Sequence, residues 1–228
     1  MCGRYTQTKS GEAIAQTFGL TSAPVVQPRY NIAPTQPVGA IAQTEDERAY
    51  RTFQWGLVPS WSKDPSIGSR MINARAETVA EKPSFRAPFK RRRCLIIADG
   101  FYEWQRTGSN RKKQPFYIQM EDQQLFGFAG LWERWQSGDG SDLETCTILT
   151  TEPNELMAPI HNRMPVILHP DDYDLWLDPD LQDGRHLQHL LQPYEPEDMQ
   201  RYPVSTTVNS PRNETPECVE PVEVKEFV

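Results

Sequence analysis

The chain has 228 residues, of which 37% are hydrophobic and 24% are charged, and this composition fits one globular domain over residues 1–228. Its net charge of −7 is unevenly distributed: residues 1–120 contain 18 Lys and Arg against 9 Asp and Glu, whereas residues 121–228 contain 6 against 22. No stretch approaches 18 consecutive apolar residues and the N-terminus is too polar for a signal peptide, so we expect a cytosolic or nuclear protein with no membrane contact.

Strands dominate the predicted elements. A first helix is expected over 10–18, where Ile14 and Phe18 share one face and Gly19 ends the helix. Apolar or β-branched runs then predict strands over 38–43, 50–58, 93–104, 115–120, 125–132, 143–151 and 164–168. Short helices are expected over 76–82, over 152–158 and over 171–191, where Pro179 breaks the helix, with an irregular tail from about residue 210. This order predicts the α+β class, with a curved, barrel-like antiparallel β-sheet and short peripheral helices.

The basic first half is typical of a surface that meets a polyanion. Two runs concentrate the positive charge, over 86–93 and 106–113, and isolated arginines occur at 4, 29, 70 and 75. The aromatic residues Trp61, Phe85 and Phe89 alternate with these basic segments along the sequence. Cations that follow phosphates, next to aromatic rings that stack on bases, are characteristic of a groove for single-stranded nucleic acid. Each run alone is also explained as a solvated edge kept charged against aggregation.

Cys2 stands directly after the initiator methionine. If Met1 is removed, this residue carries an α-amine and a thiol on adjacent carbons, which together condense with an aldehyde into a thiazolidine ring. The amine suits this chemistry because α-amino groups titrate near ~7.7–8.0, so on the order of a tenth is neutral at pH 7. The alternative is that position 2 merely tolerates any small residue.

Familiar catalytic and metal motifs are missing from the sequence. It contains no nucleophile elbow, no phosphate-binding glycine loop and no His-Glu-x-x-His pattern. The four cysteines show no Cys-x-x-Cys spacing, and His186 and His189 have no carboxylate or cysteine beside them. We therefore expect free thiols, no metal and no cofactor.

Several polar residues interrupt otherwise apolar segments. Glu103 lies between Tyr102 and Trp104 at the end of a predicted strand, an apolar setting that suits a general acid or base. A structural pair with an arginine is the alternative for this glutamate. His161 lies between a predicted helix and a strand and could equally be structural. Asn73 and Arg75, two apart, would share one face of an extended segment and could hold an amine and a phosphate together.

Six segments in order, over 1–5, 29–34, 54–61, 72–78, 93–104 and 161–166, resemble the motif series of the SOS-response-associated peptidase (SRAP) family. The resemblance extends from residue 2 to about residue 221. It implies a compact domain around a curved antiparallel sheet and a positively charged cleft for single-stranded DNA. It also implies covalent capture of abasic sites through residue 2, in a nucleoid-associated protein if the source is bacterial or a nuclear one if it is eukaryotic.

The resemblance also implies a role for particular residues. The family's reactive cysteine corresponds to Cys2, its amine-positioning asparagine to Asn73, its acid/base glutamate to Glu103 and its histidine to His161. Family contacts to DNA correspond to Arg4, Pro34, Trp61, Arg75, Thr150 and Arg163. Some members have two adjacent tryptophans where this chain has only Trp61, which predicts a weaker stacking wedge. We expect a monomer.

The expected reaction is attack of the Cys2 amine on the ring-opened sugar of an abasic site, followed by ring closure with the thiol. Two other functions remain open from the sequence. The first is a cysteine peptidase that uses Cys2 with His161 or Glu103 as base, including one limited to removing its own Met1. The second is a noncovalent module that binds single-stranded or modified-base DNA through the basic half and Trp61.

Overall fold

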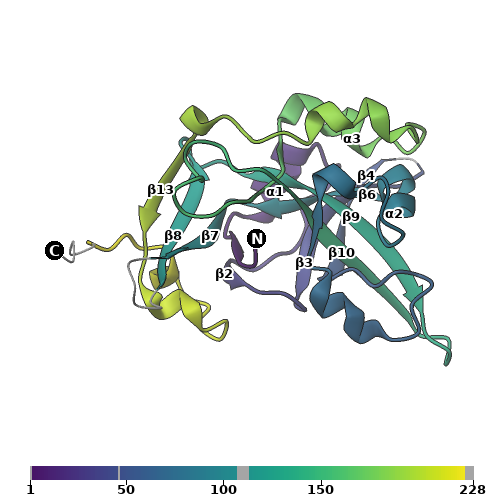
Figure 1. The fold of residues 1–228 in the computed structure, drawn as a ribbon, viewed down its shortest axis with the longest axis horizontal. Helices are drawn as coiled ribbons and strands as arrows, with labels where there is room; N and C mark the ends of the chain where they lie inside the picture. The colour runs from purple at the N-terminus through teal and green to yellow at the C-terminus, as the bar shows by residue number, and fades with distance from the viewer. Residues whose placement is uncertain (1, 46, 107–112, 224–228) are drawn as a thin grey trace.

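Two β-sheets form the centre of this computed structural model, which describes residues 2–45, 47–106 and 113–223 (Figure 1). The smaller sheet, called here the open sheet, has five strands in the order β13 (Met199–Pro203), β8 (Lys113–Met120), β7 (Gly100–Arg106), β1 (Tyr5–Gln7) and β2 (Arg29–Ile32). The larger sheet contains β11 (Met164–Pro165), β10 (Asp142–Thr151), β4 (Arg48–Trp55), β3 (Pro37–Gln43), β6 (Arg93–Ala98), β9 (Phe126–Gln136) and β12 (Ile167–Leu168), with β5 (Asn73–Arg75) paired to β10.

Five strands of the larger sheet close into a ring. Strand β10 pairs with β4 on one side and with β9 on the other, which closes the series β10-β4-β3-β6-β9. The predicted α+β class and barrel-like sheet are confirmed. Most strand pairs are antiparallel, as predicted, whereas β10 runs parallel to both β4 and β5. Long segments of the chain separate β10 from β4 and β5. These strands are therefore not joined by a hairpin, which would require them to be antiparallel.

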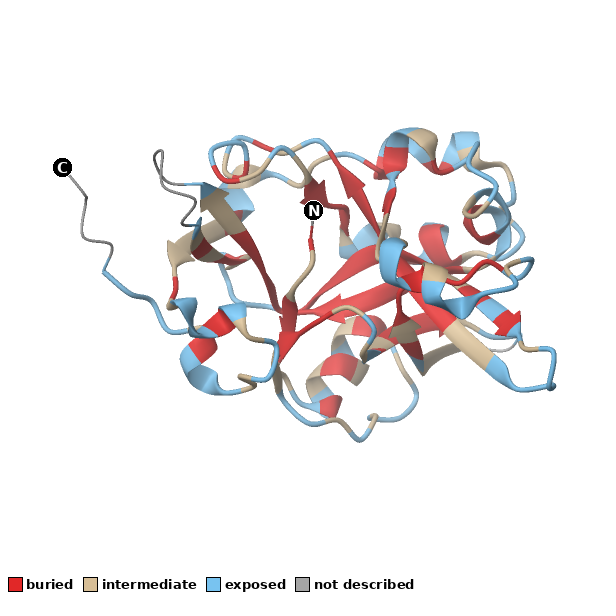
Figure 2. Ribbon diagram, turned by 60° about the horizontal axis from the view of Figure 1, so that its bottom comes forward, coloured by how far each residue is buried: buried red, intermediate tan, exposed pale blue. Residues whose placement is uncertain are grey.

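Alternating side chains on the strands divide the core into two parts. One part, called here the Cys2 cluster, is shared by the open sheet and the ring and includes the buried residues Cys2, Tyr5, Trp55, Phe101, Ile148 and Met157. The other part lies between the ring and its peripheral helices and includes Ile14, Phe18, Leu95, Leu149, Phe89 and Trp176. Buried residues follow the strands of both sheets, whereas the helices expose one face (Figure 2).

Helix α1 (Gly11–Phe18) confirms the first predicted helix. Ser10 caps its N-terminus by accepting a hydrogen bond from the backbone of Ala13, and Gly19 ends it in the left-handed conformation at φ 67°. The other two α-helices are α2 (Arg86–Arg91) and α3 (Tyr173–Leu177). Short 3-10 helices complete the list: η1 (Pro65–Arg70), η2 (Ala76–Thr78), η3 (Pro170–Asp172), η4 (Gly184–His186), η5 (Gln188–Leu190), η6 (Pro196–Asp198), η7 (Thr206–Asn209) and η8 (Pro216–Cys218).

Several predicted elements differ from the structure. The run 93–104 is two strands, β6 and β7, which belong to different sheets and meet at Asp99. Asp99 accepts hydrogen bonds from Thr6 and Thr8 and thereby fixes the chain at this change of sheet. The segment 152–158 forms turns, in which Asn154 accepts from the backbone of Met157. The helices predicted over 76–82 and 171–191 are shorter in the structure, where they form η2 and α3 with flanking 3-10 turns. Each of these short elements packs about one turn of apolar side chains against the core, which is too little to stabilise a longer helix.

The segment 205–221, called here the strap, folds back over the edge strand β2. We expected an irregular tail from about residue 210, but the strap contains η7 and η8 and is firmly bonded. Glu214 pairs with Arg29 and accepts the backbone N–H groups of Tyr30 at 2.5 Å and Asn31 at 2.7 Å. The buried Asn31 amide donates to the carbonyls of Val208, Ser210 and Asn213. The strap therefore satisfies an edge that would otherwise be open for pairing.

The loop 56–71 is held against the end of β4 by two glycines. Gly56 has φ 134°, and a Cβ atom on it would lie 2.6 Å from the Gly68 carbonyl oxygen. A Cβ atom on Gly68 would in turn lie 2.5 Å from the Gly56 oxygen. Only glycine fits such a close backbone approach at both positions. No helix in the described parts of the chain is long and apolar enough to cross a membrane.

Candidate active site

Cys2 lies at the junction of the two sheets. The N-terminal end of the chain enters between the open sheet and the ring (Figure 1), and the Cys2 side chain is fully buried. Its Sγ atom lies 4.0 Å from the carbonyl oxygen of Arg4. Burial raises the pKa of the Cys2 thiol, and the nearby negative charge of Glu103 raises it further. Both effects favour the neutral form of the thiol. Met1 lies outside the described residues.

Glu103 faces the same cluster from strand β7. It lies two residues after Phe101, which belongs to the Cys2 cluster, and it pairs in register with Phe116 on β8, which packs against that cluster. Only 3% of Glu103 is exposed. Because alternate residues of a strand share a face, the carboxylate is directed toward Cys2, in agreement with its effect on the thiol.

Asn73 reaches the cluster from the ring side. It lies on β5 and pairs in register with Ile148 of β10, a residue of the Cys2 cluster. Its side-chain Nδ2 donates to the Ile148 carbonyl at 3.4 Å. Its Oδ1 is buried, and no described residue donates a hydrogen bond to it. An acceptor in this state can orient an incoming amine N–H.

His161 joins the cluster through the turn that precedes β11. Its backbone N–H donates to the carbonyl of Met157, a residue of the cluster, at 3.0 Å. Its ring Nδ1 lies 3.0 Å from the backbone nitrogen of Arg163, which donates to it. The imidazole is thus fixed by its own loop at the border of the buried region. The structure therefore directs Cys2, Asn73 and Glu103 to one cluster and places His161 at the border of that cluster.

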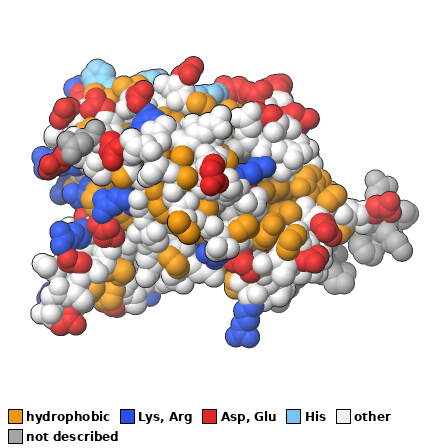
Figure 3. Space-filling view, turned by 180° about the vertical axis from the view of Figure 1, so that it is seen from behind, with side chains coloured by type: hydrophobic (Ala, Val, Ile, Leu, Met, Phe, Trp, Pro, Cys, Tyr) orange, Lys and Arg blue, Asp and Glu red, His pale blue; other side chains and the backbone are white. Residues whose placement is uncertain are grey.

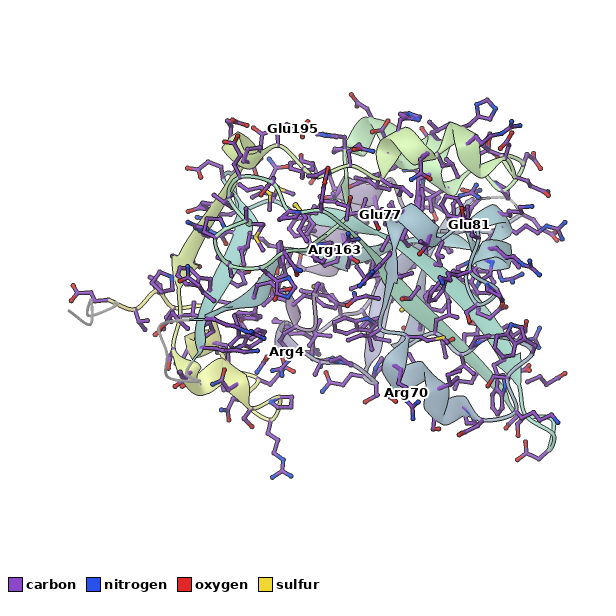
Figure 4. All side chains as sticks on the ribbon, viewed as in Figure 1. Arg4, Arg70, Glu77, Glu81, Arg163 and Glu195 are labelled. Carbon is purple, nitrogen blue, oxygen red and sulfur yellow. The ribbon has the colours of Figure 1, made fainter. Side chains whose placement is uncertain are left out.

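Arg163 is held by several polar groups. It forms a bidentate pair with Glu77 at 2.6 and 3.0 Å, and it also donates to the Thr150 carbonyl (Figure 4). The hydrogen bond from Arg163 lowers the pKa of Glu77. Thr150 is buried and lies next to the exposed Arg75, its partner in register on β5. A DNA contact by Arg163 stays a prediction. A phosphate that bound the Arg163 guanidinium would either share it with the Glu77 carboxylate or displace that carboxylate.

Arg4 lies on the other face of the open sheet. Its Nη1 donates to Asn31 at 2.7 Å and to the Val208 carbonyl at 2.9 Å, and its guanidinium lies 5.8 Å from the Trp104 ring centroid. Burial lowers the pKa of Arg4. The strap therefore fixes the residue that is two positions from Cys2, and a DNA contact by Arg4 stays a prediction.

Trp61 lies on the loop that follows β4, and Pro34 lies in the turn between β2 and β3. Trp61 is 60% exposed, which is unusual for a tryptophan and leaves its ring available for stacking. Pro34 is half-buried and precedes Thr35, whose φ of 71° is rare for a residue other than glycine. The Thr35 N–H donates to the Trp55 carbonyl at 2.8 Å, which accounts for this conformation.

Two residues of the predicted basic groove are buried, and the groove itself stays a prediction. Phe89 is buried in the core, so it cannot stack on a base. Arg93 is also buried, and its guanidinium donates to the carbonyls of Phe89, Lys90, Trp176 and Asp178 at the ends of α2 and α3. Burial lowers the pKa of Arg93 to about 10. The run 106–113 falls largely outside the described residues. Among the described residues, no cluster of His, Cys, Asp and Glu could hold a metal ion.

The sequence reasoning overlooked the residues that support the site. Asn31 and Glu214 fix the strap, and Thr6 and Thr8 bind Asp99 beside strand β1. Asn31 is part of the segment 29–34 that carries the family resemblance, which was the one available signal. No local pattern marks Glu214, because its partners are 183 to 185 residues away in the chain.

Comparison with known proteins agrees with this architecture. The family model described as "SOS response associated peptidase (SRAP)" matches residues 1–211, so the chain belongs to that family. Abasic site processing protein YoqW of Bacillus subtilis (strain 168) is 47% identical over 223 residues, covering 96% of this chain and 99% of the relative. Abasic site processing protein HMCES of Gallus gallus is 39% identical over 202 residues, covering 78% of this chain and 59% of the relative.

Solved structures share the fold. A crystal structure of a protein from Bacteroides thetaiotaomicron superposes with a TM-score of 0.87 at 30% identity, covering 97% of this chain and 100% of that one. A protein from Bordetella bronchiseptica gives a TM-score of 0.76 at 26% identity, covering 90% of this chain and 100% of that one.

Proposed function

We propose that this chain processes abasic sites in DNA by forming a covalent crosslink through Cys2 after removal of Met1. The names of its relatives support the substrate class. The observation that carries the chemistry is the convergence of Cys2, Glu103 and Asn73 on one buried cluster from two different sheets. An aminothiol, a carboxylate and an amide acceptor are the groups that an aldehyde condensation requires.

The reaction begins with the ring-opened aldehyde of the abasic deoxyribose. The neutral Cys2 amine attacks C1′, Asn73 Oδ1 accepts a hydrogen bond from the amine, and Glu103 transfers protons as the carbinolamine loses water. The thiol then adds across the resulting C=N bond, its proton passes to the nitrogen, and a thiazolidine closes. The net change is the loss of one water. Ring closure is favourable because the thiol is already held next to the imine, where effective molarities reach ~10⁵ M or more.

The state of the thiol also separates this proposal from a cysteine peptidase. A peptidase nucleophile is a thiolate stabilised at neutral pH by nearby positive charge. Here burial and Glu103 act in the opposite direction and raise the pKa of Cys2. A neutral thiol is sufficient for the second step of thiazolidine formation, because the amine makes the first attack. The proposal therefore includes no general peptidase turnover, and it requires only that Met1 is removed before the reaction.

Single-stranded DNA is the proposed partner, and the protein is proposed to act as a monomer. The exposed Trp61 supports stacking on an unpaired base, and the exposed Arg75 lies on the strand that carries Asn73. A base in duplex DNA is already stacked on its neighbours and would not offer its face to Trp61.

Intact-mass measurement after incubation with abasic single-stranded DNA tests the proposal. We expect one adduct whose mass is one water below the sum of protein and DNA, together with loss of the free protein. The matched control is a protein with one glycine inserted directly before Cys2, after mass measurement has shown that this glycine is retained. In that protein the nitrogen of the cysteine is part of a peptide bond and cannot attack an aldehyde. An equally abundant adduct in this control would show that the aminothiol is not the reactive group.

A further inference from the structure

A pocket that none of the four predicted catalytic residues lines opens where three segments of the acidic half meet, at the outer side of the Cys2 cluster, to which Phe126 of its lining belongs. It has a volume of about 430 Å³ and lies between the β8–β9 turn, the junction of β12 with α3, and the segment before β13. Its floor is apolar: Leu125, Phe126, Leu168 and Tyr173 line it, and each is less than 9% exposed. This volume is in the range of sites that bury a ligand or a few side chains.

Three carboxylates form the rim of this pocket. They belong to Glu121, Asp122 and Asp198, all of which are exposed. In the described ranges, no Lys or Arg forms an ion pair with any of the three. Tyr194, which also lines the pocket, has its pKa raised first by burial and then by Asp198, Glu195 and Asp122. The carboxylates of Asp122, Glu195 and Asp198 therefore all lie close enough to Tyr194 to affect it, so their negative charge is concentrated around the pocket.

The rim is built before any partner arrives. The Glu121 N–H donates to the Asp198 carbonyl at 2.8 Å, which joins the turn to the segment before β13. The Gln200 side chain donates to the Glu121 carbonyl at 3.1 Å, and Asp122 accepts from the backbone of Gln124 at 3.1 Å. On one flank, the ring of His169 stacks on Tyr194 with centroids 4.5 Å apart and bonds to Glu195 at 2.9 Å.

We propose that this pocket docks a basic segment of a partner protein, with the aliphatic part of a lysine or arginine on the apolar floor and its charge at the acidic rim. Lys and Arg are the side chains that combine an apolar stem with a cationic end. Charge complementarity favours this occupant, since the rim is negative and lies in the half of the chain with 22 acidic against 6 basic residues.

The same charge excludes DNA from the pocket. A polyanion is repelled by three carboxylates, so this site and a DNA-binding face would not compete. Figure 4 shows the separation: Glu195, beside the pocket, lies near the upper edge of the molecule, and Arg70, on the loop that carries Trp61, lies near the lower edge. Figure 3 shows acidic side chains along the corresponding upper edge of the opposite view. This inference does not depend on the chemistry at Cys2.

The probe is the peptide Ac-Gly-Leu-Arg-Leu-Arg-Gly-NH₂, titrated at low salt into ¹⁵N-labelled protein and followed by amide chemical shifts. We expect saturable shifts at Gln124, Leu125 and Tyr194. The double variant Asp122→Asn, Asp198→Asn should weaken binding about tenfold, as expected for two partly screened charge contacts. Asparagine keeps the acceptor that Asp122 offers to Gln124, so the turn is preserved.

The matched control is the double variant Glu81→Gln, Asp180→Asn, which removes the same net charge from exposed positions elsewhere. It should bind the peptide as the unmodified protein does. Equal weakening in both double variants would mean nonspecific attraction and would overturn the proposal. Equal binding of a peptide with 2,3-diaminopropionic acid in place of both arginines would also overturn it, because that side chain keeps a positive charge without the long aliphatic stem, and the apolar floor would then contribute nothing. Crosslinking to abasic DNA should proceed at the same rate with the peptide bound.

Discussion

The ring and the open sheet solve the problem of exposed strand edges in different ways. The ring closes on itself, so its central strands have no free edge. The open sheet ends at β2, whose backbone N–H groups at Tyr30 and Asn31 are bonded instead by the Glu214 side chain. The edges of the ring are therefore satisfied by backbone hydrogen bonds within the sheet. The edge of the open sheet at β2 is satisfied by a few side chains from the C-terminal part of the chain.

The candidate site takes residues from both. Cys2 precedes β1 and Glu103 lies on β7, both in the open sheet, whereas Asn73 lies on β5, which is attached to the ring through β10. The distance between the reacting groups therefore depends on how firmly the open sheet is held against the ring. We infer that the strap is part of what keeps the site assembled, although none of its residues faces the Cys2 cluster.

The largest expected effect is that of Cys2→Ser. This change keeps the α-amine and removes the thiol, so a Schiff base can form but the thiazolidine cannot. We expect complete loss of the heat-stable adduct, with a weaker adduct that survives only after borohydride reduction. Denaturing gels with and without reduction measure both. A heat-stable adduct of normal yield would assign the reaction to another nucleophile, such as a lysine.

Glu103→Gln tests the second residue that the open sheet contributes. Glutamine keeps the shape of the side chain but cannot exchange protons, so crosslinking should slow by about 10²-fold, a typical contribution of general acid/base catalysis. Noncovalent affinity for single-stranded DNA should stay the same. Single-turnover kinetics measure the crosslinking rate, and binding to undamaged single-stranded DNA measures the noncovalent affinity separately. A parallel loss of DNA affinity would make Glu103 a structural residue.

Glu214→Ala tests the side-chain edge of the open sheet. It removes the acceptor of two backbone N–H groups and the partner of Arg29, and we expect a loss of about 2–3 kcal/mol in the free energy of unfolding. Amide hydrogen exchange at Tyr30 and Asn31 should accelerate at the same time.

The matched control is Glu77→Ala on the ring side, where the lost pair with Arg163 involves a carboxylate that is half exposed. Such a pair contributes less than about 1 kcal/mol. Equal destabilisation by the two variants would show that the strap is no more important than a surface ion pair.

The smallest effect concerns thiol reactivity. The pKa of Cys2 is raised, so its thiolate fraction should grow about tenfold per pH unit between pH 7 and 9, and alkylation by iodoacetamide should follow without levelling off. Because Glu103 contributes to this shift, Glu103→Gln should speed alkylation of Cys2 by a few fold at fixed pH. Cys94 of the ring, whose pKa is raised by burial, serves as the internal control and should not respond. Peptide mass mapping distinguishes the two thiols.

The sequence was most informative where a signal is local. Helix α1 has its cap, its apolar spacing and its terminal glycine within ten residues, and it was predicted correctly. The short strands β1, β2 and β5 were overlooked, because three or four residues carry little periodicity and their pairing comes from distant segments. The run 86–93 was interpreted as a charged surface, since nothing local reveals that Phe89 and Arg93 are buried.

The candidate site follows the same rule. Each of Cys2, Asn73, Glu103 and His161 was selected from its own motif. Their convergence could not be derived from the sequence, because it depends on the closure of the ring and on the parallel pairing of β5 with β10. The roles of Asn31 and Glu214 depend on a chain end that returns across more than 170 residues.

The close approach of Gly56 and Gly68 bears on how fast DNA can be captured. The loop between them carries Trp61, and the close approach of the two backbones fixes the two ends of the loop relative to each other. If Trp61 stacks on a base as proposed, part of the entropy of ordering this segment was already lost when the protein folded. Capture of a strand would then need less rearrangement of the loop than in a chain without this contact.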